Sequence, residues 1–413
     1  MKKRKLTAAL LAAFCLTAAG CAGLPAERTK LFDGAGQKQE VSGAASGTEK
    51  FPEEDGSLSE TYDFLEEGSG YALKFLTDAE KVWYRDMERI LGGFGTEENL
   101  SEEALEAGLD EEDLDRIFQC VMNDHPELFY VEGYSYTKYT KSGQDDAILS
   151  VEFSGRYSVD PETAARRAEE IRGAAGEILA GIDAGADQYE KVKYVYDTLI
   201  RRTDYALEAE DNQNIYSVFV NRRSVCQGYA KATQYLLNRL GVECALVLGT
   251  VQTGEGHAWN LVNVDGSYYY VDTTWGDASY RKEESEGAEA GAMPEINYDY
   301  LNVTTDELLR THTPQEGQQL PLCTDTAANY YVREGALFTD YDTAQMEALF
   351  EKALAQGRED VTIKCADGEC YREICDALIE GQEIFGYLPD GGESVAYTRN
   401  DGQRSLTFWV TNE

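Results

Sequence analysis

The sequence predicts an α+β protein, in which helices pack beside antiparallel strands. Two patterns in the middle of the chain indicate this class. Apolar residues between Tyr229 and Leu240 recur at spacings of three and four, which is typical of an amphipathic helix. Further along, two alternating segments flank Asp265-Gly266, a dipeptide that strongly favours the tight turn of a β-hairpin. At 413 residues, the chain is long enough for two or three domains.

Residues 1–21 have the layout of an export signal. Basic residues Lys2 to Lys5 precede an apolar run, Leu6 to Thr17, which is shorter than the ~20 residues needed to span a membrane. The small residues that follow, ending in Cys21, resemble the lipobox of bacterial lipoproteins. This resemblance implies cleavage before Cys21 and lipidation of its thiol. We therefore expect the protein outside the cytoplasm, at the bacterial cell surface, attached to the membrane through a lipid anchor only. The alternative is ordinary signal cleavage beside an incidental cysteine.

The charge of the chain excludes one class of partner. Lys and Arg number 37 against 76 Asp and Glu, which gives a net charge of -39. A polyanion of this size repels phosphate backbones, so we expect no nucleic-acid partner. The charge as a whole is explained well enough by solubility.

The region before the centre of the chain divides into a linker and a small domain. Residues 22–60 are rich in small and polar residues and predict a disordered acidic linker, because they can bury too little surface to offset the entropy of ordering. Residues 61–185 predict an α/β accessory domain, with strands near 129–136 and 148–153. Its helices are expected over Asp78–Leu91, Leu114–Asn123 and Ala164–Ile182.

We predict no site in this accessory domain. His125 lies beside a helix end and is expected to cap or pack. The acidic run Asp110 to Asp115 lacks the central glycine and the spaced oxygen ligands of a calcium loop, and is typical of a solvated helix start.

A central domain is predicted over residues 186–325. It begins with a helix that ends near Thr203, and a second helix begins at Cys226. The first turn of a helix presents unpaired N–H groups and the positive end of the dipole, so this position favours a thiolate at Cys226. A strand is expected from Cys244 to Val251, followed by the hairpin.

The hairpin turn predicts which residues meet across it. If Asp265-Gly266 is a two-residue loop, Trp259 faces Asp272 and His257 faces Thr274. Asp272 then shares a sheet face with His257 and lies diagonal to it, within reach of a hydrogen bond. A slip of one residue would separate the pair onto opposite faces, so the prediction depends on the turn.

Cys226, His257 and Asp272 supply the three parts of a thiol nucleophile. The imidazole takes the thiol proton, and the carboxylate fixes the tautomer of the imidazole and stabilises its charged form. Asp277 is a second acid nearby, which we interpret as a structural or turn residue.

These residues and their neighbours resemble the transglutaminase-like superfamily, whose core is related to the papain-like cysteine proteases. The matching segments are Cys226 with Gly228-Tyr229-Ala230, then His257-Ala258-Trp259-Asn260, then Val271-Asp272-Thr273-Thr274-Trp275-Gly276-Asp277. The resemblance implies a helix carrying the cysteine, packed on an antiparallel sheet carrying histidine and aspartate. It also implies attack on peptide or protein amide bonds through a thioester. Water would complete a protease or amidase reaction, and an amine would complete a transfer.

An oxyanion stabiliser is also needed, and the backbone N–H of Cys226 is one natural donor. The resemblance implies a second donor from an upstream side chain, for which Tyr216 is the candidate and Gln213 the rival. We expect no cofactor and no metal, since the chain has only 3 histidines. The expected partner is a protein or peptide substrate, and a substrate associated with the cell wall is one candidate. The competing hypothesis is a non-catalytic surface protein that uses the same fold and its 27 tyrosines to bind or to act as a scaffold.

The rest of the chain carries no recognised chemistry. Six cysteines remain for pairings that the sequence cannot choose among, or for none. Residues 281–297 predict an acidic loop beside the hairpin, and His312 is expected in a loop. Residues 326–413 predict a small α/β domain with strands at Val361–Lys364 and near Val395 and Leu406. Its helices are expected over Thr343–Gln356 and Tyr371–Leu378.

Overall fold

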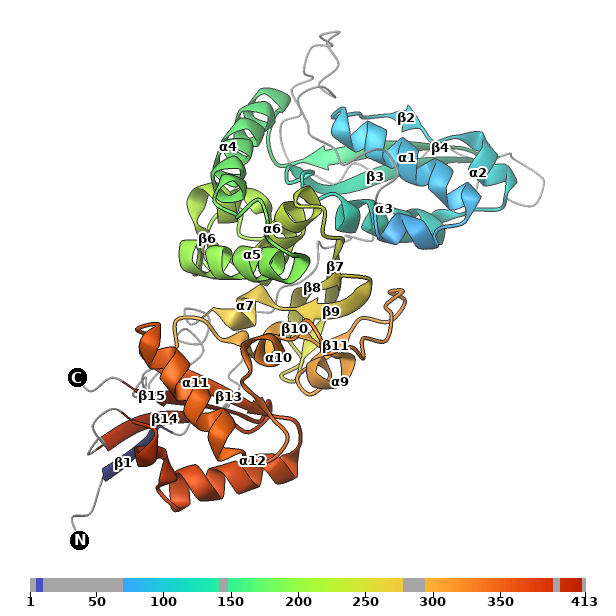
Figure 1. Ribbon diagram of the computed structural model, residues 1–413. Helices are drawn as coiled ribbons and strands as arrows, with labels where there is room; N and C mark the ends of the chain where they lie inside the picture. The colour runs from blue at the N-terminus through green and yellow to red at the C-terminus, as the bar shows by residue number, and fades with distance from the viewer. Residues whose placement is uncertain (1–4, 10–69, 141–147, 278–293, 389–393, 411–413) are drawn as a thin grey trace. The chain divides into compact units, whose positions relative to one another are not determined.

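The computed structural model describes residues 5–9, 70–140, 148–277, 294–388 and 394–410 (Figure 1). They belong to two compact units, one comprising residues 22–177 and the other residues 1–21 and 178–413. Cys21, the predicted linker 22–60 and residues 281–293 of the predicted acidic loop lie outside the described residues. The domain boundaries expected near residues 60, 185 and 325 stay predictions.

The unit of residues 22–177 contains a small antiparallel sheet in the order β2-β4-β3, with helices packed beside it (Figure 1). A capping box at Thr77 begins α1, and a second one at Asp110 begins α3, so side chains satisfy the first N–H groups of both helices. Its elements are η2 (Ala72–Phe75), α1 (Asp78–Gly92), β2 (Glu98–Asn99), α2 (Glu102–Glu106), α3 (Glu111–Asp124), β3 (Val131–Thr140), β4 (Ile148–Tyr157) and α4 (Pro161–Ala180), which runs into the second unit.

His125 is the C-cap residue of α3 and is buried, in agreement with the capping or packing role expected for it. Its Nδ1 lies 3.0 Å from a carboxylate oxygen of Glu127, and its Nε2 lies 2.9 Å from the Tyr84 hydroxyl and 3.3 Å from Glu88. Burial by itself lowers the pKa of His125, but the hydrogen bond to Glu127 and the surrounding carboxylates outweigh it and raise that pKa above its ordinary value.

The second unit has at its centre a sheet in the order β10-β9-β8-β7-β11, with helix α6 packed against β7 and β8 (Figure 1). This mixture of helices and antiparallel strands confirms the predicted α+β class. The central elements are α5 (Gln188–Arg202), β5 (Asp204–Tyr205), η3 (Ser217–Asn221), β6 (Arg223–Ser224), α6 (Cys226–Arg239), β7 (Cys244–Val251), β8 (Gly256–Val264), β9 (Ser267–Val271), α7 (Thr273–Gly276), η4 (Tyr298–Tyr300), β10 (Leu301–Val303), α9 (Thr305–Leu308) and β11 (His312–Pro314).

The predicted hairpin register is confirmed between β8 and β9. Val264 pairs with Ser267, and Asn260 pairs with Val271. The prediction that the second strand continues to Thr274 was wrong. Strand β9 ends at Val271, and the short helix α7 begins at Thr273. The cause is Asp272, which is the N-cap of α7 and accepts a hydrogen bond from the N–H of Trp275, 3.1 Å away.

The C-terminal segment of this unit forms a second sheet in the order β1-β14-β15-β13-β12. Helices α11 and α12 pack against β13 (Figure 1). The elements are β1 (Lys5–Ala9), α10 (Tyr330–Glu334), β12 (Leu337–Phe338), α11 (Thr343–Ala355), β13 (Asp360–Cys365), α12 (Gly368–Cys375), η5 (Asp376–Glu380), η6 (Glu383–Gly386), β14 (Ser394–Asn400) and β15 (Ser405–Trp409).

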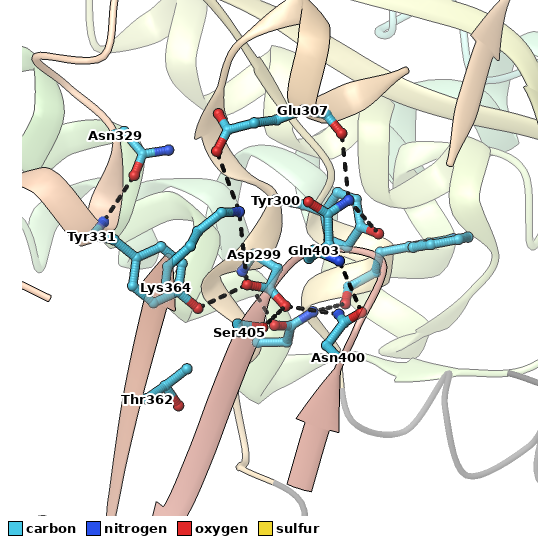
Figure 2. Close-up of polar contacts among 12 residues, drawn as sticks. Asp299, Tyr300, Glu307, Asn329, Tyr331, Thr362, Lys364, Asn400, Gln403 and Ser405 are labelled. Carbon is cyan, nitrogen blue, oxygen red and sulfur yellow. Dashed lines mark hydrogen bonds and ion pairs between the residues drawn. The ribbon is translucent and has the colours of Figure 1, made fainter. Parts of the chain in front are cut away.

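A buried polar cluster joins this C-terminal sheet to the centre of the unit. Asp299 of η4 accepts hydrogen bonds from Tyr331, Asn400 and Ser405, at 3.0, 2.9 and 2.7 Å (Figure 2). The Nζ of Lys364 on β13 lies 3.4 Å from a carboxylate oxygen of Glu307 on α9, within the same cluster. Because a buried polar group is stable only when it is paired, these contacts fix the C-terminal strands against the central sheet.

His312 is not in a loop, as the sequence led us to expect. It begins β11, which pairs antiparallel with β7, and its side chain is buried. The reason is tertiary: Val251 at the end of β7 is the partner of His312, 61 positions away in the sequence. Among the helices that the structure describes, none has the length and apolar composition required to cross a membrane.

Candidate active site

Cys226 is the first residue of α6 and is completely buried. The N-cap residue, Val225, makes no side-chain hydrogen bond to the first turn, so no side-chain cap competes for the N–H groups there. Cys226 packs in one apolar cluster with Ala230 of the same helix and with Leu246 and Ala258 of the sheet. Ala258 directly follows His257 on β8, so the cluster holds the start of the helix against the strand that carries the histidine.

Six of the described cysteines are free: Cys120, Cys244, Cys323, Cys365, Cys370 and Cys375. Burial raises the pKa of Cys120 and Cys323 to about 11, and raises that of Cys244 well above its ordinary value. These thiols are therefore poor nucleophiles at neutral pH, and any chemistry at Cys226 requires its reduced form.

The first turn of α6 is in close contact with the loop that precedes it. A Cβ added to Gly228 would collide with the hydroxyl of Ser224 and would lie 3.0 and 3.2 Å from the carbonyl oxygens of Asn212 and Asn214. Gly228 is thus needed for the close approach of this loop. Gln213 lies between those two asparagines, so the rival oxyanion donor is on a backbone segment that touches the helix start.

Tyr216, the other predicted oxyanion donor, is on the same loop. It precedes the π-helical turn η3, its backbone N–H bonds to Asn214 Oδ1 over 2.9 Å, and its side chain is half-buried. π-Helical turns are rare and occur often at functional sites. The roles of Tyr216 and Gln213 stay predictions.

His257 and Asp272 lie in hydrogen-bond contact. The Nε2 of His257 is 2.8 Å from Asp272 Oδ2, and both side chains are buried. The hairpin supplies the geometry, because β8 carries His257 and the chain places Asp272 directly after β9, at the N-cap of α7. With Nε2 used by the carboxylate, Nδ1 is the ring nitrogen left to exchange a proton with a thiol.

A second histidine binds the same carboxylate oxygen. His312 Nε2 lies 3.0 Å from Asp272 Oδ2, and its Nδ1 lies 2.8 Å from the hydroxyl of Thr311. Sequence reasoning missed this residue. A three-residue strand has no periodicity to indicate it, and the pairing of β11 with β7 is visible only in the fold.

The charges of this centre follow from burial and these bonds. Burial favours the neutral form of Asp272, but the charge of His257 and the hydrogen bonds from both histidines outweigh it and hold the pKa of Asp272 below its usual range. Burial lowers the pKa of His312, and hydrogen bonding to Asp272 offsets only part of that effect. We therefore describe Asp272 as a carboxylate and His312 as a neutral imidazole near pH 7.

Aromatic rings surround the two histidines and exclude water. The ring centroids of Trp259 and Trp275 lie 5.9 and 6.0 Å from that of His257. Trp275 is also 4.7 Å from the ring of His312, and Trp259 is 5.0 Å from it. Because the surroundings are apolar, the hydrogen bonds to Asp272 are stronger here than they would be in water.

Comparison with known proteins places the central segment in a family. Residues 176–273 match the family model of the transglutaminase-like superfamily. The chain carries a transglutaminase-like domain.

Two curated relatives match a short segment. Kyphoscoliosis peptidase of Mus musculus is 27% identical over 103 residues, and that of Homo sapiens is 29% identical over 103 residues. Each match covers 21% of this chain and 16% of the relative, so this chain matches less than a fifth of the length of either relative.

Solved structures are similar at low identity. A structure described as a TGase is 15% identical, with a TM-score of 0.25, over 47% of this chain and 59% of its own. The periplasmic domain of TgpA from Pseudomonas aeruginosa, bound to ethylmercury, is 17% identical, with a TM-score of 0.21, over 36% of this chain and 67% of its own.

Asp277, four residues beyond the matched segment, makes a structural contact. The hydroxyl oxygen of Tyr229 lies 2.6 Å from Asp277 Oδ2 and 2.7 Å from the carbonyl oxygen of Thr203, so its single hydrogen can be donated to either acceptor. Tyr229 lies on α6, so the pair ties the helix that begins at Cys226 to the end of α5 and to the residue after α7.

One group in the part of the chain that the structure describes has the spacing to hold a metal ion. The ligand atoms of His257, Asp272 and His312 all lie within 4.8 Å of one another. The separations of the two histidines from Asp272, 2.8 and 3.0 Å, are those of charge-assisted N–H···O bonds to a shared oxygen. The geometry therefore favours hydrogen bonding, and the expectation that the protein uses no metal stays a prediction.

Proposed function

We propose that the protein is a thiol enzyme that acts on amide bonds of peptides or proteins, with Cys226 as nucleophile, His257 as general base and acid, and Asp272 as the residue that orients His257. The observation that carries this proposal is the buried 2.8 Å contact between His257 and Asp272. Strand β8, which holds His257, packs against the helix that begins at Cys226. The match of residues 176–273 to the transglutaminase-like superfamily supports the same chemistry.

The proposed reaction begins when Nδ1 of His257 takes the proton of the reduced Cys226 thiol. The sulfur then attacks the carbonyl carbon of the amide, and the C–N bond breaks as the imidazolium returns the proton to the leaving amine. The thioester is resolved by water in hydrolysis or by a second amine in transfer, with His257 again accepting the proton of the attacking group. Asp272 remains ionised throughout and stabilises the imidazolium.

The negative oxygen of the tetrahedral intermediate needs fixed donors. The backbone N–H of Cys226 at the start of α6 is one of them, because the first turn of a helix has N–H groups with no partner within the helix. Tyr216 is proposed as the second donor and Gln213 as its rival.

We also propose that the protein is exported and lipid-anchored through Cys21, as the N-terminal sequence predicts. Cleavage before Cys21 would remove β1, which pairs with β14. Strand β14 would then be an edge strand of the C-terminal sheet in the processed protein. Substrates on this view are surface or cell-wall-associated proteins.

The decisive experiment compares wild type with Cys226→Ala in the presence of a reducing agent. Extracellular proteins are incubated with each and examined by mass spectrometry for new termini and for isopeptide-linked species. New termini mean hydrolysis, and crosslinked species mean transfer. Cys120→Ala is the matched control, because it removes a free cysteine from the other unit and should leave both products unchanged.

A second measurement tests the nucleophile directly. At mildly acidic pH, iodoacetamide should alkylate reduced Cys226 faster than any of the six free cysteines, and His257→Ala should remove that advantage. If Cys226 reacts no faster and neither product depends on it, the enzyme hypothesis fails. The fold would then serve the non-catalytic binding or scaffold role.

A further inference from the structure

His312 is a buried histidine for which the reaction above has no step. Its side chain is fully enclosed, with 1% of the residue exposed, and it lies against Trp259, Trp275 and Tyr300. A buried imidazole that served only to fill space would not need two directional partners. His312 has both, at Asp272 and at Thr311.

The direction of each hydrogen bond around His312 follows from the donors available. The Asp272 carboxylate only accepts, so Nε2 of His312 carries the hydrogen of the 3.0 Å contact. In the neutral ring Nδ1 then accepts, and the hydroxyl of Thr311 donates to it over 2.8 Å. Asp272 Oδ2 thus receives N–H groups from two imidazoles, and its Oδ1 receives the N–H of Trp275. Both oxygens of the Asp272 carboxylate therefore accept hydrogen bonds.

The chain of donors continues beyond Thr311. Its hydroxyl oxygen lies 3.2 Å from the hydroxyl of Tyr300, which in turn accepts from the side-chain amide of Gln403 over 3.2 Å. Gln403 is buried in the turn between β14 and β15, and Figure 2 shows it against Tyr300 and Glu307. One consistent direction of donation therefore runs from the C-terminal sheet to Asp272.

We propose that His312 is a positioning residue of the active site, which holds the Asp272 carboxylate in the orientation where the same oxygen receives His257, and that Gln403, Tyr300 and Thr311 hold His312 in turn. The kinetic part of this inference rests on the proposed function. The inference also makes the turn between β14 and β15 a structural part of the active site, although this turn lies some 130 residues beyond Asp272 in the sequence.

The kinetic test uses substitutions in the full chain. His312→Leu removes the hydrogen bond to a charged acceptor and should lower kcat by about ten- to a hundredfold while changing KM by less than about twofold. His312→Gln keeps an N–H donor and should recover part of the loss. Gln403→Leu, at the far end of the chain of donors, should give a smaller decrease in kcat. His125→Gln removes a buried histidine from the other unit and should leave kcat unchanged.

A spectroscopic test does not depend on turnover. The chain has 3 histidines, so labelling with ¹⁵N-histidine in a Cys226→Ala background gives ring-nitrogen signals from three imidazoles, which single variants can assign. We expect His312 with hydrogen on Nε2 and an accepting Nδ1. We also expect His312→Leu to shift the resonances of His257, whereas a merely space-filling residue would leave them in place.

The outcomes are distinguishable. If His312→Leu changes stability but leaves both kcat of the folded protein and the His257 resonances as in wild type, His312 only packs and the inference is overturned. If the protein shows no turnover of amides at all, the proposed function fails, and the His257 resonances alone decide the positioning geometry. If His312→Leu does not fold, Thr311→Val keeps the histidine and should shift its Nδ1 resonance and lower kcat; unchanged values would overturn the inference.

Discussion

The side-chain amide of Asn260 on β8 donates to the backbone carbonyl of Ala230 on α6 across 2.9 Å in the interior of the transglutaminase-like domain. The same nitrogen lies 3.3 Å from the carbonyl of Ala245 on β7. Because Cys226 begins α6 and His257 lies on β8, one amide fixes the helix and the strand that carry two residues of the proposed triad.

Asn260→Ala should therefore affect both stability and reactivity. It leaves two buried carbonyl groups without this donor, which should lower the free energy of unfolding by about 1–3 kcal/mol. Alkylation of reduced Cys226 should also slow in the folded protein. Urea unfolding and iodoacetamide rates measure the two effects. Gln252→Ala, which removes an exposed side-chain amide just after β7, is the control and should change stability by less than about 0.5 kcal/mol. Equal values for both variants would contradict the role of Asn260.

Asp272→Asn should strongly lower activity without changing the size of the side chain. The asparagine has only one acceptor oxygen, and its NH₂ group would meet an N–H of His257 or of His312. One ring must then change tautomer, which disturbs the base. The same change lowers kcat about 10⁴-fold in serine hydrolases, and we expect a decrease of about 10²- to 10⁴-fold in kcat here. The assay uses a substrate identified from the new termini found by mass spectrometry. If kcat falls by less than about threefold, Asp272 does not orient the base.

The hairpin could be predicted because its information is local. The Asp265-Gly266 turn alone sets the register that brings Asp272 to His257. The positive φ of both turn residues, 52° and 89°, is the conformation that such a turn requires. The sheet face on which each side chain lies then follows from the alternation of residues along the strand.

His312 could not be predicted in the same way. Its partners, Val251 and Asp272, are 61 and 40 positions away in the sequence, and no local pattern encodes such contacts. The sequence also led us to extend β9 to Thr274, because alternation there continues although Asp272 caps a helix. The capping role of Asp272 depends on its side chain turning back to the N–H of Trp275, which competes with the strand and ends it.

Gly228→Ala tests the close approach at the start of α6. Its Cβ would collide with the Ser224 hydroxyl and press on two carbonyl oxygens, so either the loop or the first helical turn must shift. We expect a loss of about 1–3 kcal/mol in stability and slower alkylation of Cys226. Gly173→Ala is the matched control, because an added Cβ there meets nothing within 4 Å and alanine favours a helix. A Gly228→Ala protein as stable and as reactive as wild type would show that the loop does not press on the helix.

Removal of metal ions should leave the activity intact. No step of the proposed mechanism needs a metal, and both histidines and Asp272 are used by hydrogen bonds. Dialysis against EDTA, followed by assay in chelated buffer with a reducing agent, should change kcat by less than about twofold. Loss of activity that returns when zinc is added would instead show that the three side chains with metal-compatible spacing hold an ion in the working enzyme.

The two units should respond to pH in opposite directions, because their buried histidines have pKa values shifted in opposite directions. The pKa of His125 is raised by neighbouring carboxylates, so its stabilisation is fully present below about pH 6.5 and is lost as pH rises through the raised value. The pKa of His312 is lowered by burial, so its stabilisation is present above about pH 6.5 and is lost as pH falls through the lowered value.

Hydrogen exchange on the full chain, corrected for the intrinsic effect of pH, measures both units at once. Residues 70–140 should lose protection as pH rises above about 6.5, whereas the strands that carry His257 and His312 should lose it as pH falls below about 6.5. Asp272 adds to the acid sensitivity of the second unit only below about pH 4, because its pKa is held below the ordinary value. His125→Gln should remove the first dependence and His312→Gln the second. Each variant should remove the pH dependence of protection in one unit and leave that of the other unit unchanged. If protection in both units followed the same pH dependence, the opposite pKa shifts of the two histidines would be contradicted.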